Sequence, residues 1–187
     1  MTSSSMLLPL VLLLASSSAW GMAHAYGGGG LNHICLYMYE TTAGANATLL
    51  ATVLPQPNTT FGMIGLLDDV LLDGPYPASS KVLGRFQGLL AFAGQVTPPG
   101  MQSLVSFVFT AGSRFSGSNL VVAGTVTSFD GSFERAIVGG TGVFRMARGW
   151  CIVKAVWNPT AVSTVYEVNL FVKTEANYQM PALRMDA

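Results

Sequence analysis

The feature that most limits the fold is the succession of short β-type segments and turn residues along nearly the whole chain. Runs rich in Val, Leu, Phe, Tyr and Thr are separated by Gly, Pro, Asn and Asp, and helical periodicity is nearly absent. Eight strands are predicted, at 32–40, 48–54, 62–72, 81–94, 102–111, 119–127, 143–156 and 163–174. Their short links leave no room for crossover helices, which favours an antiparallel meander over parallel βαβ units.

A meander of this length has two edge strands that could pair with other chains. Closing the sheet on itself removes both edges, so the predicted fold is all-β, an eight-stranded antiparallel β-barrel, with a β-sandwich as the alternative. The interior of an eight-stranded barrel has room for side chains or for one small ligand.

The first 25 residues differ from the rest of the chain. Their apolar run, residues 6–15, is too short to cross a bilayer of about 30 Å, and small residues follow it up to Ala23-His24-Ala25. This pattern is typical of a secretory signal peptide, predicted at 1–25, and 26–187 would be a single mature domain. Within it, 26–31 is a flexible lead-in and 176–187 a tail without pattern, and no later run is long enough for a membrane anchor.

An extracellular route has consequences for four residues. Asn46 and Asn58 each begin an N-x-Thr sequon in a segment rich in Thr, Pro and Asn, so both are predicted glycosylation sites. An oxidising compartment also permits a disulfide between Cys35 and Cys151, but the sequence leaves their pairing open.

Composition argues against several classes of protein. Charged residues make up 10% of the chain and the net charge is +0, so neither nucleic acid nor an anionic membrane is attracted electrostatically. Without the signal peptide one histidine remains, His33, which with two cysteines and scattered carboxylates forms no recognisable metal cluster or catalytic triad. No metal and no cofactor are predicted.

The segment IVGGTGVFRMARGW (137–150) has the glycine density of a phosphate-binding loop. It lacks the third glycine of G-x-G-x-x-G, the lysine of a P-loop and a following helix, so we interpret it as a tight turn between two strands. Arg85, Arg145 and Arg148 are expected to bond backbone carbonyls or carboxylates, with Asp68 and Asp69 as structural partners of such groups.

Among the carboxylates, Glu40 stands apart. Strand alternation places it on the same face as Ile34, Leu36 and Met38, the more aliphatic side of its segment. If this face points into the barrel, burial would raise the pKa of Glu40 and make it a candidate acid. The alternative is that Glu40 ends the strand in solvent.

Several motifs in a fixed order give the chain a family resemblance. They are Tyr37-Met38-Tyr39-Glu40, FGMIGLLDDVLLDGP (61–75), VLGRFQG (82–88), SFVFT (106–110), SNLVVAGTV (118–126), ERAIVGGTGVFRMARGW (134–150) and STVYEVNLFV (163–172). Over about residues 34–172 the chain resembles the dirigent family of plant secreted proteins. The resemblance implies an eight-stranded antiparallel barrel that is a homo-oligomer (dimer or trimer), is located in the apoplast or cell wall and is often glycosylated.

The resemblance also implies a function. Dirigent barrels bind phenoxy radicals of monolignols such as coniferyl alcohol, which a separate laccase or peroxidase generates, and guide their regio- and stereoselective coupling towards lignan or lignin-related products. The barrel then needs no oxidising centre of its own and contributes orientation and proton transfer. Whether such a chain is itself an enzyme stays open.

The family's pocket residues are carried over one position at a time. The acid that ends the first strand corresponds to Glu40, the candidate catalytic residue. Two tyrosines correspond to Leu90 and Phe92, an aspartate to Val126 and an arginine to Phe133, so these four are predicted to line the substrate cavity. Their apolar character leaves two alternatives, a non-catalytic protein that binds a hydrophobic ligand or organises the wall, and a cyclase or dehydratase with Glu40 as its acid.

Overall fold

A computed structural model gives the structure of the chain and describes residues 30–55, 57–95 and 100–174. The elements are β1 (Leu31–Thr41), β2 (Leu49–Val53), β3 (Ile64–Leu72), β4 (Val82–Phe92), β5 (Met101–Phe109), β6 (Asn119–Val126), β7 (Ser132–Gly140), the 3₁₀ helix η1 (Gly142–Phe144), β8 (Arg148–Thr160) and β9 (Ser163–Lys173). The predicted signal peptide (1–25), the tail (176–187) and most of the lead-in lie outside the described residues.

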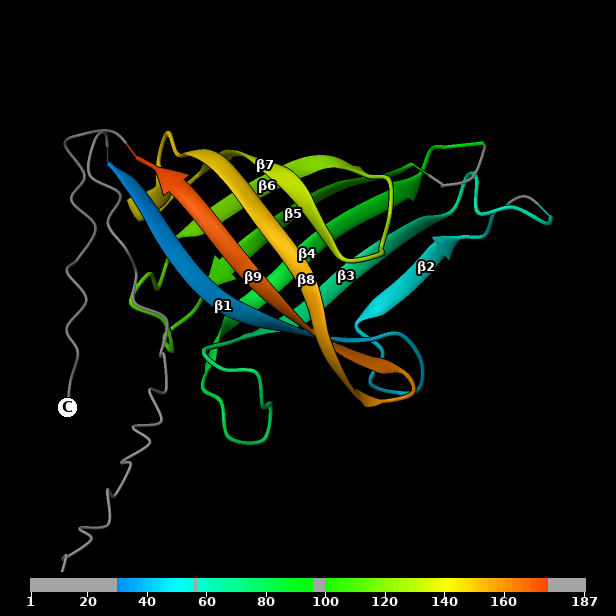
Figure 1. Cartoon of the computed structure of the whole chain (residues 1–187), viewed down its shortest axis with the longest axis horizontal. Coiled ribbons are helices and arrows are strands. Elements are labelled where there is room, and N and C mark those ends of the chain that lie inside the picture. Colours follow the sequence, from blue (N-terminus) through cyan, green and yellow to red (C-terminus); the bar gives the residue numbers. More distant parts are fainter. Residues whose placement is uncertain (1–29, 56, 96–99, 175–187) are drawn as a thin grey trace, which may run out of the picture.

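Eight of the strands close into an antiparallel barrel (Figure 1). Their order is β1-β9-β8-β7-β6-β5-β4-β3, and β3 pairs with β1 to complete the ring. β2 is an additional strand that pairs with the first half of β3, whereas β1 pairs with the last three residues of β3. The predicted all-β, eight-stranded antiparallel barrel is therefore confirmed.

The eight strands that form the barrel are not the same eight that the sequence predicted. Residues 132–140 form β7, which carried no strand prediction, and the strand expected at 143–156 begins only at Arg148. β7 escapes a pattern search because its alternation is partly reversed: Arg135 is buried, whereas Ala136 and Val138 are exposed. The glycine-rich segment contains the end of β7, the turn through η1, where Gly142 has φ 59°, and the start of β8. It is a turn between two strands, as expected.

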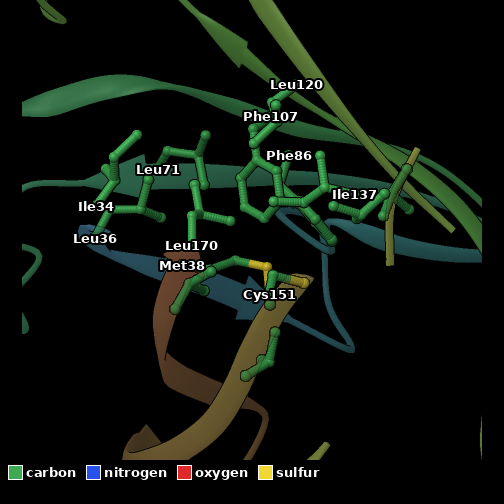
Figure 2. Close-up of a cluster of buried hydrophobic side chains, with 14 of the residues drawn as sticks. Ile34, Leu36, Met38, Leu71, Phe86, Phe107, Leu120, Ile137, Cys151 and Leu170 are labelled. Atoms are coloured by element: carbon green, nitrogen blue, oxygen red, sulfur yellow. The ribbon is translucent and has the colours of Figure 1, made fainter. Parts of the chain in front are cut away.

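The barrel interior is packed at one end and hollow at the other. Phe109, Phe115 and Phe144 fill the packed end, with ring centroids 5.0 to 5.5 Å apart. Figure 2 shows the adjoining core, where side chains from strands all around the barrel meet. Burial of each large apolar side chain stabilises the fold by about 1.5–3 kcal/mol, so this core holds in place the strands that carry the hollow end.

The two cysteines lie on opposite faces of the barrel wall. Cys35 pairs with Asn169 and Cys151 with Leu170, so both flank β9. The side chain of Cys35 is exposed on the outside, whereas that of Cys151 is buried in the core, and both are free thiols. A disulfide between them is not formed, because the strand wall separates the two sulfur atoms.

Candidate functional site

A cavity of about 210 Å³ occupies the hollow end of the barrel. Its polar groups are the carboxyl of Glu40, the guanidinium of Arg135 and the phenol of Tyr166, and the rest of its lining is apolar. The apolar residues are Met38, Leu49, Met63, Leu67, Phe86, Leu90, Phe92, Met101, Phe129 and Phe133. A mostly apolar hollow with a few convergent polar groups is the usual form of a small-molecule site.

The structure brings most of the predicted cavity residues together. Glu40, Leu90, Phe92 and Phe133 all line the cavity. Val126 does not line it; this residue is 1% exposed and packs in the core, where it pairs with Met101 across β5 and β6. Met101, its partner on the neighbouring strand, lines the cavity instead.

Glu40 stands at the end of β1 with its side chain turned inward. Ile34, Leu36 and Met38 precede it on the same face and are buried, so the alternation of the strand carries the carboxyl into the barrel. The hydroxyl of Tyr166 on β9 donates a hydrogen bond of 3.3 Å to Oε1 of Glu40. Burial raises the pKa of Glu40, while this hydrogen bond and the charge of Arg135 act against the rise.

Asp69 is a second buried carboxyl group near Glu40. It is 0% exposed, and Thr48 Oγ1 donates a hydrogen bond of 2.5 Å to its Oδ1. Its Oδ2 has no hydrogen-bond partner among the described residues. Burial first, and then the negative charge of Glu40, raise the pKa of Asp69 to about 8, so this side chain is neutral near pH 7.

Asp68 and Asp69 are neighbours in sequence but face opposite sides of β3. Asp68 lies outside and accepts hydrogen bonds from Arg85 Nε at 2.7 Å and from Gln87 Nε2 at 2.9 Å. The expected pairing of a carboxylate with a strand arginine is therefore correct for Asp68. It is wrong for Asp69, whose partner is the hydroxyl of Thr48 inside the wall.

The exterior arginine Arg148 behaves as predicted. Its Nη1 donates hydrogen bonds of 2.8 Å to the carbonyl oxygens of Val138 and Ala147. It fastens the turn between β7 and β8 and takes no part in the cavity.

Arg135 and Tyr166 are the polar cavity residues that carried no prediction. Arg135 lies on the inward face of β7 with Phe133 and Ile137, and Tyr166 lies on the inward face of β9 with Val168 and Leu170. Strand alternation places each of them once its strand is recognised. A polar residue at an inward position of a strand was the signal that could have found both.

Three further findings concern metal ligands, membrane spans and the predicted glycosylation sites. No group of three or more His, Cys, Asp or Glu side chains that could hold a metal ion gathers within the described residues. In the same part of the chain, no helix has the length and apolar character that a membrane crossing requires. Asn46 and Asn58, the predicted glycosylation sites, are exposed and lie outside the strands.

Comparison with known proteins agrees with this architecture. A family model described as dirigent-like protein matches residues 31–173. The chain belongs to the dirigent family. It is 36% identical to dirigent protein 1 of Arabidopsis thaliana, over 89% of this chain and 96% of that protein.

Other dirigent relatives are pterocarpan synthases. Pterocarpan synthase 1 of Glycyrrhiza echinata is 31% identical, with 65% of this chain and 66% of that protein covered. The solved structure of a pterocarpan synthase dirigent protein covers 78% of this chain and 92% of its own, with 27% identity and a TM-score of 0.67. This chain thus shares its barrel fold with a protein named as a pterocarpan synthase.

Proposed function

We propose that this protein is a dirigent protein that binds one phenolic intermediate in its cavity and directs a stereoselective ring closure, with Glu40 as the proton donor. The observation that carries the proposal is the inward carboxyl of Glu40, which is held by Tyr166 in an apolar cavity that raises its pKa. A carboxyl group that keeps its proton closer to neutral pH is suited to act as a general acid. The likeness to pterocarpan synthases supports ring closure as the reaction.

The proposed substrate class is a quinone methide that carries its own hydroxyl group. Glu40 donates its proton to the carbonyl oxygen, which becomes a phenol hydroxyl, and the ring becomes aromatic. The substrate's hydroxyl oxygen attacks the exocyclic carbon and forms the new C–O bond. The proton that this hydroxyl releases returns to the carboxylate of Glu40. The product is an isomer of the substrate, so the step consumes no oxidant, reductant or cofactor.

The size and lining of the cavity support a reaction of a single molecule. A volume of about 210 Å³ lies below the range of about 300–1,000 Å³ that is usual for ligand pockets, which favours one substituted phenol as the ligand. Its apolar lining excludes the water that would otherwise add to the exocyclic carbon. The barrel would therefore protect the electrophile as well as orient it.

The test uses quinone methides with a tethered hydroxyl, released from masked precursors in the presence of purified protein. Chiral chromatography of the ring-closed product measures the enantiomer ratio. We expect the wild-type protein to give an excess of one enantiomer and Glu40→Gln to give the racemic mixture of the uncatalysed reaction while still binding the product. A racemic mixture from the wild type across the panel, or an undiminished excess from Glu40→Gln, would contradict the proposal.

A second function is favoured by the apolar side of the cavity. Leu90, Phe92 and Phe133 offer ring contacts of the kind that would orient a phenoxy radical. The radical would derive from a monolignol such as coniferyl alcohol, and a laccase or peroxidase would supply it. Coniferyl alcohol and a laccase, with and without the protein, test this function: an enantiomeric excess in the coupled product supports it, and an unchanged racemic mixture counts against it.

The proposal extends to secretion and assembly. Export through residues 1–25 to the apoplast and glycosylation at Asn46 and Asn58 follow from the sequence patterns. Assembly into a homo-oligomer is supported by exposed leucines in register across β2, β3, β4 and β5, namely Leu50, Leu66, Leu89 and Leu104. Light scattering of the purified glycoprotein gives its mass, and a monomer at micromolar concentration would contradict assembly.

A further inference from the structure

Arg135 is a buried cation whose donors are not used by the protein. The side chain is 5% exposed, and its Nε and Nη1 are buried without a hydrogen-bond partner among the described residues. Leaving buried donors unpaired destabilises a fold by about 1–3 kcal/mol per group, and more for charged groups. An unpaired buried guanidinium that lines a cavity is a candidate for contact with a ligand.

Aromatic rings hold the Arg135 side chain in place without occupying its donors. The guanidinium carbon lies 4.9 Å from the ring centroid of Phe133 and 5.9 Å from that of Phe86. Both rings also line the cavity, so the guanidinium is presented next to the space that a ligand would fill. Arg85 on the outside of the barrel differs, because Asp68 accepts its hydrogen bond.

The charge of Arg135 is not buried there in order to neutralise a nearby carboxylate. Glu40 favours its charged form through space, but no carboxylate oxygen lies within ion-pair distance of it in the described part of the chain. Burial acts in the opposite direction and lowers the pKa of Arg135, because the guanidinium has lost its water. A ligand in the cavity with negative charge on an oxygen atom would supply the hydrogen-bond acceptor for Arg135 that the described residues do not provide.

We propose that Arg135 is the anchor for the carbonyl oxygen of the quinone methide, so that this oxygen, which takes up phenolate-type negative charge, accepts a hydrogen bond from the guanidinium where Arg135 lines the cavity. This inference rests on the proposed function and names the form in which its substrate class binds. The planar guanidinium can give two parallel hydrogen bonds to oxygen acceptors, which fixes orientation as well as position.

The anchor also has a consequence for Glu40. An anionic oxygen bound at Arg135 removes the positive charge that favours the ionised form of Glu40. Ligand binding would therefore favour the protonated carboxyl that the proposed ring closure needs. One substrate oxygen would be held at β7 while the acid on β1 stays loaded with its proton.

The test compares two ligands of nearly the same shape with the purified protein. 4-Nitrophenol ionises near neutral pH, whereas 4-nitroanisole carries a methyl group on the same oxygen and cannot ionise. At pH 8 we expect the wild-type protein to bind 4-nitrophenolate at least about tenfold more tightly than 4-nitroanisole, as charge-assisted hydrogen bonds predict. Absorbance of the phenolate reports its ionisation directly, and the bound probe should ionise at lower pH than the free one.

Variants test whether Arg135 causes the tighter binding of the phenolate. Arg135→Gln should abolish the preference for the phenolate and Arg135→Lys should retain part of it, while Arg145→Gln, an exposed residue of the turn after η1, should leave it unchanged. Equal affinity of the wild type for the two probes overturns the anchor but leaves ring closure by Glu40 standing, since neither probe reacts. Failure to bind either probe also overturns the anchor, while ring closure is tested separately by its own product assay. The wild-type comparison does not depend on whether a variant folds.

Discussion

The two walls of the cavity differ in what they can do to a bound molecule. Glu40, Tyr166 and Arg135 come from β1, β9 and β7, which lie along one arc of the barrel ring. Leu90, Phe92 and Met101 come from β4 and β5, on the other arc, and present only hydrocarbon and thioether groups. A cavity that is polar on one arc and apolar on the other accepts an amphipathic ring in one orientation, which is the requirement for stereoselectivity.

The same contrast recurs within a single strand. Asp68 and Asp69 are adjacent on β3. Asp68 is exposed to solvent and forms an ion pair with Arg85, whereas Asp69 is a buried neutral acid. Burial, not residue type, separates their roles. The predictions below exploit these contrasts.

The largest expected effect is on the rate of ring closure. Glu40→Gln should lower the protein-dependent rate by about 10²–10⁴-fold, because a positioned general acid contributes that much. Leu90→Met on the apolar wall is the matched control and should change the rate far less, since no proton passes through it. Single-turnover measurements give both rates. If the two substitutions lower the rate of ring closure by similar factors, the polar and apolar walls do not differ in their role.

The next effect is on stability and follows from the raised pKa of Asp69. Between about pH 4 and pH 8 the folded protein keeps a proton that the unfolded chain has lost, so stability falls as pH rises. From this group alone, the free energy of unfolding should drop by about 3 kcal/mol between pH 5 and pH 7. Asp69→Asn, which cannot ionise, should remove this slope.

Chemical denaturation at several pH values measures the effect. Asp68→Asn serves as the control, because it removes only an exposed ion pair worth about 0–1 kcal/mol and should keep the wild-type slope. If Asp69→Asn keeps the wild-type dependence of unfolding free energy on pH, then burial of Asp69 is not the cause of that dependence.

The smallest effect concerns the hydrogen bond from Tyr166. This bond favours the ionised form of Glu40, so Tyr166→Phe should raise the pKa of Glu40 further. The rate of ring closure falls as pH rises through the pKa of its acid, and in the variant this fall should move to higher pH. A shift of the pH–rate profile to lower pH would show that Tyr166 does not act on Glu40 in this way.

Strand alternation and turn residues were enough to predict the closed barrel and to place Glu40 on the aliphatic face of its strand, because both depend on local pattern, but they left open whether this face points inward. Arg135 was not predicted, because β7 itself was not predicted. A buried charged residue interrupts the alternation of apolar and polar residues that identifies a strand. Asp69 escaped because its partner, Thr48, lies in a different segment and meets it only when β2 and β3 pair. Val126 packs in the core while its cross-strand partner Met101 lines the cavity, and residue correspondence to a family does not distinguish these two positions.

The central claim is that the cavity holds Glu40 as an acid with a raised pKa, and carboxyl NMR tests it without any substrate. Protein labelled with ¹³C at the glutamate carboxyl is titrated, and Glu40→Gln assigns the signal. The structure predicts a midpoint clearly above the ordinary glutamate value of about 4.3. A midpoint at or below that value would show a solvated carboxylate and contradict the account.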